Sequence, residues 1–120
     1  MKEATSVSGS FPGFLEAGDL DGNDITLAIK VVRESGPDDK GQDGKPLEKP
    51  IVVFANARKE WVLNITNART IRTLYGDKYE KWKGKKVTLY PTTCQLFWKT
   101  KACIRVRMID PDTGKEPDLF

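Results

Sequence analysis

Apolar and polar residues alternate along several stretches of the chain, which is the pattern of half-buried β-strands. In the first stretch, Ile25, Leu27, Ile29 and Val31 share one face. Similar β-rich runs follow, and two of them are close enough in the chain to form a hairpin. Together with a further hairpin arm over 93–100, they predict five or six strands, over residues 24–32, 51–56, 60–65, 84–91 and 102–109.

The period changes to that of a helix between the third and fourth of these runs. Four apolar residues there fall at helical spacing, namely Ala68, Ile71, Leu74 and Tyr75. Thr66 or Asn67 can cap the start, and Gly76 is placed to end the helix. The pattern therefore predicts a helix from Thr66 to Tyr75 that plugs one end of a barrel through Ile71 and Leu74.

The order of these elements predicts a mainly β protein, an OB-fold-like small Greek-key barrel of five to six strands with one short helix between strands 3 and 4. The chain divides into a flexible N-terminal arm (1–10), a single OB-like domain (11–109) and an acidic C-terminal tail (110–120). Within the domain, residues 34–50 hold three Gly, three Pro and many charges, which indicates a long flexible loop between strands.

The composition of the 120 residues, 38% hydrophobic and 31% charged, suits one soluble globular domain. The N-terminus carries no signal-like apolar stretch, so we expect a cytoplasmic protein with no membrane association. The chain has no histidine and only two cysteines, Cys94 and Cys103. Histidine-dependent catalytic pairs and metal sites are therefore excluded, and we expect a non-enzymatic protein without a cofactor.

Charge is distributed very unevenly along the chain. Residues 1–49 hold 6 basic and 10 acidic residues, whereas residues 50–109 hold 13 basic and 3 acidic ones. A polyanion binds to such a surplus largely because condensed counterions are released from its phosphates. A solvated basic surface is the alternative.

The outward face of the last strands combines cations with aromatic rings, as a single-stranded nucleic acid requires. Phe97 and Trp98 are adjacent in a strand, so they point to opposite faces and one of them is a candidate for base stacking. Phe54 and Trp61 are further candidates, although core packing is the stronger alternative for each. The expected nucleic-acid-binding residues are Phe54, Trp61, Lys86, Thr88, Tyr90, Phe97, Trp98, Lys99, Arg105 and Arg107.

Three sequence elements resemble a group of small phage and prophage proteins whose genes lie among replication and recombination functions. They are LNITNARTIRTLYG, WKGKKVTLYPTT and IRVR, and the resemblance covers residues 20–32 and 62–108. It implies a role in phage replication or recombination, with the bacterial cytoplasm as the location.

The end of the chain, DPDTGKEPDLF, resembles the acidic tails of bacterial and phage single-stranded-DNA-binding proteins. Residues 110–120 are rich in Pro, Asp and Gly, which predicts disorder. The resemblance implies that this tail engages replication or recombination proteins through Asp118, Leu119 and Phe120. A terminus without a role is the alternative.

These features together predict a protein that binds single-stranded DNA through a basic and aromatic barrel face. Two other functions stay open. One is a phage protein-interaction module that engages a host protein, and the other is a small metal-dependent nuclease using Asp19, Asp21 and Asp24. Pairing of two subunits through an exposed barrel edge also stays open.

Overall fold

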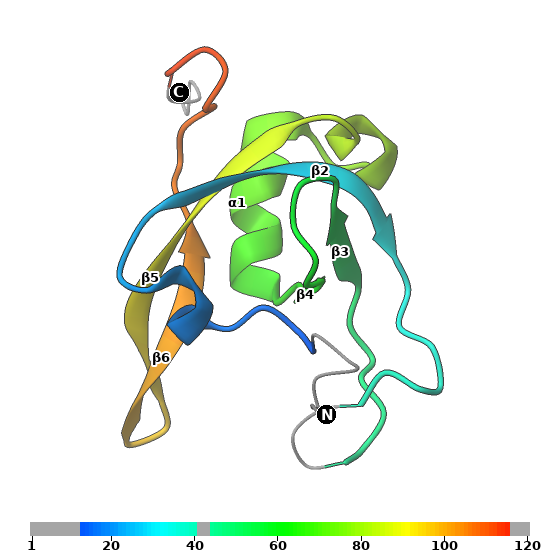
Figure 1. Cartoon of the computed structure of the whole chain (residues 1–120), viewed down its shortest axis with the longest axis vertical. Coiled ribbons are helices and arrows are strands. Elements are labelled where there is room, and N and C mark those ends of the chain that lie inside the picture. Colours follow the sequence, from blue (N-terminus) through cyan, green and yellow to red (C-terminus); the bar gives the residue numbers. More distant parts are fainter. Residues whose placement is uncertain (1–12, 41–43, 116–120) are drawn as a thin grey trace, which may run out of the picture.

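One antiparallel sheet of five strands, curled into a half-barrel around one α-helix, dominates the described residues (Figure 1). The computed structural model describes residues 13–40 and 44–115. The strands lie in the order β4-β3-β2-β5-β6. The prediction of a mainly β protein is therefore confirmed. The elements are the 3-10 helix η1 (Ala17–Leu20), β2 (Ile25–Arg33), β3 (Ile51–Phe54), β4 (Trp61–Val62), α1 (Ile65–Tyr75), the 3-10 helix η2 (Tyr79–Trp82), β5 (Lys86–Leu96) and β6 (Lys99–Val106).

Strand β2 lies at the centre of the sheet and curves strongly across its top in the view of Figure 1. Leu27 and Ile29 are buried, as the alternation predicts. The register with β3 then shifts between Ile29 and Val31, which indicates a bulge. Because the bulge changes which side chains face inward, Val32 packs against the core in place of the expected Val31.

Helix α1 confirms the predicted helix to within one residue at its start. Its cap is Asn64, whose side chain accepts a hydrogen bond of 2.9 Å from the Asn67 N–H, and so neither Thr66 nor Asn67 is the cap. At the other end, Gly76 has φ 107° and donates its N–H to the Arg72 carbonyl at 2.8 Å. Gly76 is thus the expected stop, in a conformation that favours glycine.

In chain order α1 lies between β4 and β5, but its place in space differs from the expected plug at one end. The helix lies in the hollow of the curved sheet (Figure 1). There Ile71 is fully buried, and the buried Asn67 donates its side-chain N–H to the Ile104 carbonyl of β6 at 2.9 Å. Trp82 of η2 is also buried and donates to the Gly76 carbonyl at 2.9 Å. These contacts secure the helix against the sheet.

The described part of the long 34–50 loop is held against the sheet by Arg33. Its guanidinium donates two hydrogen bonds to the Asp39 carboxylate, at 2.8 and 3.0 Å, and two to Glu60, at 2.6 and 3.2 Å. Ser35 donates its hydroxyl to the Leu47 carbonyl at 2.8 Å. The loop was expected to be flexible along its length, but its described part is tied to Arg33 through Asp39, and Ser35 and Leu47 are joined to each other.

This arrangement predicts a pH dependence. The hydrogen bonds from Arg33, and then from the Gly36 N–H, lower the pKa of Asp39 to about 2 from the ordinary 3.8. A carboxyl group whose pKa is lower in the folded state stabilises the fold at pH values above its pKa in the unfolded chain. This contribution is lost as the pH falls from about 4 through about 2. NMR titration should find the Asp39 carboxyl titrating near pH 2, and Arg33→Gln should return it toward 3.8. An ordinary pKa in the native protein would contradict the arrangement.

Candidate nucleic-acid interface

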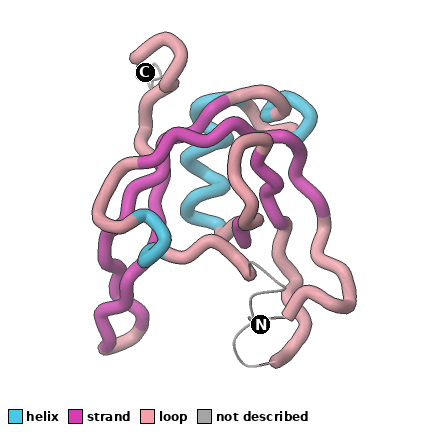
Figure 2. Tube along the Cα trace, viewed as in Figure 1, coloured by secondary structure: helices cyan, strands magenta, loops and turns pink. Residues whose placement is uncertain are grey.

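Strands β5 and β6 form a long hairpin that extends beyond the rest of the sheet (Figure 2). Pairing of β2 with β5 ends at Ile25↔Leu89, whereas β5 and β6 remain paired as far as Leu96↔Lys99. Pro91, which lacks an N–H, lies just past the end of the β2 pairing, where no neighbouring strand needs that donor. Proline at this position therefore allows β5 to run without interruption from Lys86 to Leu96, where two separate strands were expected. The outer half of the hairpin projects from the core.

The tip of the hairpin presents two large aromatic rings to solvent. Phe97 and Trp98 are 84% and 85% exposed, and their ring centroids are 6.0 Å apart. They occupy the turn between the strands, so both are exposed, whereas strand positions would have placed them on opposite faces. Phe97 has φ 59°, a left-handed conformation that a two-residue hairpin turn requires at its first position and that is costly for a bulky residue.

Strand β6, which begins directly after the tip, contains cations that have no acidic partner among the described residues. Residues 86–107 contain five basic residues and no acidic residue. Within the described part of the chain, Lys99, Lys101 and Arg105 form no ion pair with a carboxylate, and Arg105 donates to the Ile104 carbonyl at 3.0 Å. Their positive charge is therefore available to an external anion.

Arg107, another cation of this face, is already paired with an acidic residue. The Arg107 guanidinium lies 3.7 Å from the centroid of the Tyr90 ring and makes two hydrogen bonds to Asp24, at 3.0 and 3.1 Å. Arg107 lowers the pKa of the Asp24 carboxyl. Tyr90 stays on the outer face and half-buried, opposite Arg105 in the register. Arg107 covers one face of the Tyr90 ring. A base can stack on that face only after it displaces the guanidinium.

Lys86 and Thr88 lie at the far end of the same face and contact other parts of the chain. Lys86 forms an ion pair of 3.2 Å with Asp112, and the hydroxyl of Thr88 lies 2.8 Å from that of Thr26. Both residues belong to the expected face, but their polar groups are partly engaged.

The beginning of the acidic tail packs against the domain, contrary to the expectation of disorder over 110–120. Residues 110–115 form a turn in which the Gly114 N–H donates to the Asp110 carbonyl at 2.7 Å. Burial, and then the charges of Asp110 and Asp112, raise the pKa of Tyr75 to about 12. Asp118, Leu119 and Phe120 lie outside the described residues.

Phe54 and Trp61 belong to the hydrophobic core. Each is 3% exposed, and the two rings stack with centroids 6.2 Å apart. Both rings belong to the cluster of buried side chains that forms the core. Burial therefore removes both residues from the candidate interface and supports the alternative of core packing.

The face also contains residues that were not among the expected ones. Lys101 follows Lys99 at the two-residue spacing of one strand face, which is the signal that identifies it. Cys94 and Cys103 lie on the same face, because Cys94 pairs with Lys101 and Cys103 with Thr92. Burial, and then the neighbouring Cys94, raise the pKa of the Cys103 thiol.

The acidic residues near the start of the domain bind cations of the protein itself. Asp19 forms an ion pair of 2.8 Å with Lys59, and Asp24 pairs with Arg107. Residues 13–40 and 44–115 contain no group of three His, Cys, Asp or Glu side chains positioned to hold a metal ion.

Comparisons of the chain with protein-family models, with curated proteins and with solved structures find no match. In the described part of the chain, no helix has the length and apolar character needed to cross a membrane.

Proposed function

We propose that the chain is a non-enzymatic protein that binds single-stranded DNA through the β5–β6 hairpin. One observation carries the proposal: two rings that are 84% and 85% exposed stand at the tip of a hairpin whose strands contain basic but no acidic residues. Exposing two large rings to water is unfavourable in a protein that has no use for them.

The two kinds of side chain match the two parts of a single strand. Unpaired bases offer their π-faces, and stacking on an aromatic ring contributes about 1 to 3 kcal/mol per base whatever the base is. The phosphates offer negative charge, which Lys99, Lys101 and Arg105 can neutralise. Because neither interaction reads the edges of the bases, we expect little sequence preference.

The topology supports the same function. We infer an OB-like relationship from the strand order β4-β3-β2-β5-β6 with a helix between β4 and β5 in the chain, although no pairing joins the edge strands β4 and β6 among the described residues. In OB-folds, the loop between the last two strands is one of those that bind oligonucleotides. In this chain that loop is the aromatic tip, Phe97 and Trp98. The resemblance to small phage and prophage proteins favours replication or recombination as the context.

Binding to a labelled 30-nucleotide single strand at low salt, followed by fluorescence anisotropy, tests the proposal. A duplex of the same length and polyglutamate serve as comparison ligands. We expect the single strand to bind more tightly than either. Equal binding of polyglutamate would favour the protein-interaction module, since a flexible acidic chain supplies charge without bases, and failure of the single strand to bind would overturn the proposal.

The ion pair between Lys86 and Asp112 leads to a prediction about the tail. Asp112 lies 3.2 Å from Lys86 and adds negative charge to the face that binds phosphates. Asp112→Asn should therefore tighten binding of the single strand a few-fold at low salt, with the gain disappearing at high salt because exposed charges are screened. Asp38→Asn, at an exposed position of the 34–50 loop, is the control. An equal gain from both variants would mean that only net charge matters.

A further inference from the structure

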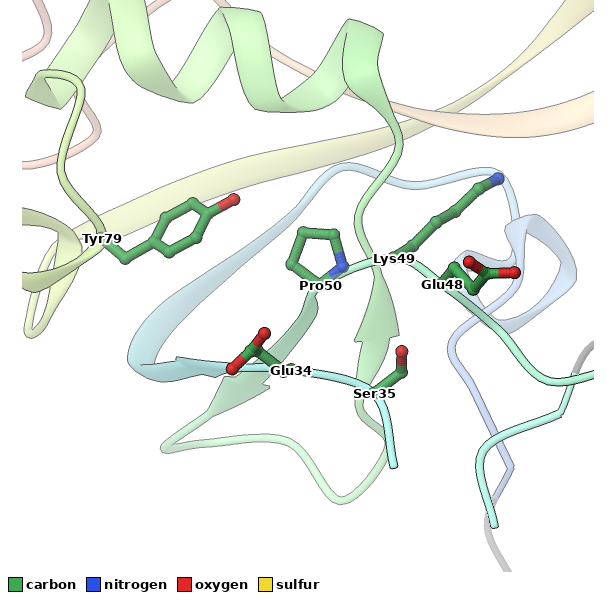
Figure 3. A pocket seen from close by; sticks show the side chains of 6 residues that line it. All are labelled: Glu34, Ser35, Glu48, Lys49, Pro50 and Tyr79. Atoms are coloured by element: carbon green, nitrogen blue, oxygen red, sulfur yellow. The ribbon is translucent and has the colours of Figure 1, made fainter. Parts of the chain in front are cut away.

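A groove lies between the 34–50 loop, the start of α1 and η2. Two cavities of about 360 and 390 Å³ share Lys49, Pro50 and Tyr79 as lining residues. Figure 3 shows the Tyr79 side chain extending toward Pro50, with Glu34 and Glu48 around the same space. Since the two cavities share three residues, they form one continuous groove.

The floor of the groove is apolar. It is formed by Leu63, Ala68 and Pro50, and it is flanked by two large side chains that stay exposed, Ile65 at 66% and Tyr79 at 44%. Exposed apolar side chains that line a cavity, with polar groups at the rim, mark a binding surface more often than isolated ones do.

The rim of the groove carries negative charge that the described residues do not neutralise. Glu34 and Glu48 line the groove, and within the described part of the chain neither forms an ion pair. Lys49 is the single cation among the lining residues of the two cavities. An occupant with large apolar side chains and flanking positive charge is therefore the best match.

We propose that this groove receives the hairpin tip of a second copy of the chain. The tip combines what the groove requires, because Phe97 and Trp98 supply two exposed rings and Lys99 and Lys101 supply positive charge. Glu34 and Glu48 then face these lysines across the contact. Charges of opposite sign at the edge of an apolar contact favour this pairing over the contact of two like surfaces.

The contact joins two copies head to tail. The hairpin tip is at the lower left of Figure 1, whereas the strand ends that border the groove, those of β2 and β3, are at the right. The tip of one molecule thus cannot reach its own groove. A single contact between two different surfaces leaves a free tip and a free groove at the ends, so the association continues into an open chain, or into a ring if the rotation between copies closes.

The contact is small and therefore weak. Two aromatic side chains bury about 150 to 250 Å² each, and the whole contact stays below the roughly 1,200 Å² at which specific stable complexes begin. We expect association only at high protein concentration and low salt. The same rings stack on bases in the proposed function, so single-stranded DNA and a second copy compete for the tip.

Sedimentation velocity of the pure protein without nucleic acid tests the inference. The mean sedimentation coefficient should rise with concentration, and Trp98→Ala in the tip and Tyr79→Ala in the groove should each weaken the association about tenfold or more. Met108→Ala, which removes an exposed apolar side chain outside both surfaces, should leave the association unchanged. A wild-type protein that stays monomeric at every concentration overturns the inference.

Mixing the two variants gives the sharpest result. Trp98→Ala keeps an intact groove and Tyr79→Ala keeps an intact tip, so an equimolar mixture should form a dimer and stop there. Loss of association in Trp98→Ala alone, with Tyr79→Ala like the wild type, would mean that two tips pair with each other and the groove has no part. Binding of DNA is not needed for any of these outcomes, so they are independent of the proposed function.

Charge reversal supplies a second test. Glu48→Lys should weaken the association, and so should Lys99→Glu, because each places like charges at the rim of the contact. A mixture in which the Glu48→Lys groove meets the Lys99→Glu tip should recover it. If the mixture associates no better than the single variants, the two residues do not face each other and the proposed contact is wrong.

Discussion

Replacing Phe97 and Trp98 together by Ala will weaken binding of single-stranded DNA by at least about 2 kcal/mol, or roughly 30-fold. Each ring offers one stacking surface, and such surfaces are worth about 1 to 3 kcal/mol per base. Both rings are more than four-fifths exposed, so their removal takes nothing from the core. The slope of log affinity against log salt should stay nearly unchanged, since no charge is removed.

The melting temperature separates a loss of stacking from a loss of structure. The double variant should melt near the wild-type temperature, because both side chains are exposed and alanine at position 97 bears the same left-handed φ of 59°. Met108→Ala, an exposed apolar change outside the hairpin, should bind as the wild type does. Unchanged DNA affinity in a folded double variant would remove the tip from the interface.

Replacing Lys99, Lys101 and Arg105 together by Gln will flatten the salt dependence of binding. Each lost phosphate contact should reduce the slope by about 0.7, so the triple variant loses up to about 2 from it. The affinity lost is greatest at low salt and disappears as the salt concentration rises. The three cations have no acidic partner within the described part of the chain, so no internal ion pair is broken.

Arg107→Gln is the matched control for this charge effect. Its guanidinium is held by Asp24 at 3.0 and 3.1 Å, so its positive charge is largely compensated before DNA arrives. We expect the slope to change by well under 0.7 for this variant. If Arg107→Gln flattens the slope as much as any one of the three free cations does, net charge and not the hairpin determines binding.

The strands and the helix could be predicted because local signals fixed them. Period-two alternation located β2 and β5, and helical spacing located α1 between Asn64 and Gly76. The bulge in β2 could not be predicted, because it depends on the register with β3 and not on the residues of β2 alone. The place of α1 in the hollow of the sheet likewise depends on a distant contact, from Asn67 to β6.

The candidate site shows the same division between local and distant causes. Alternation along the sequence predicts the basic face of β5 and β6, and the sequence itself shows that these strands contain no acidic residue. Which cations stay free does not follow, because Asp24 and Asp112, the partners of Arg107 and Lys86, come from distant parts of the chain. Phe54 and Trp61 were ambiguous for the same reason, since an aromatic residue in a strand fits a core as well as a binding face.

The indole N–H signals of the three tryptophans give the most direct test of the hairpin as the binding site. Trp61 and Trp82 are buried, at 3% and 1% exposed, whereas Trp98 is 85% exposed, so each protein sample contains its own controls. As a short oligothymidine is titrated in, the Trp98 indole signal should move progressively to saturation while the other two stay in place. Saturated binding with an unmoved Trp98 signal would contradict the proposal that this hairpin binds single-stranded DNA.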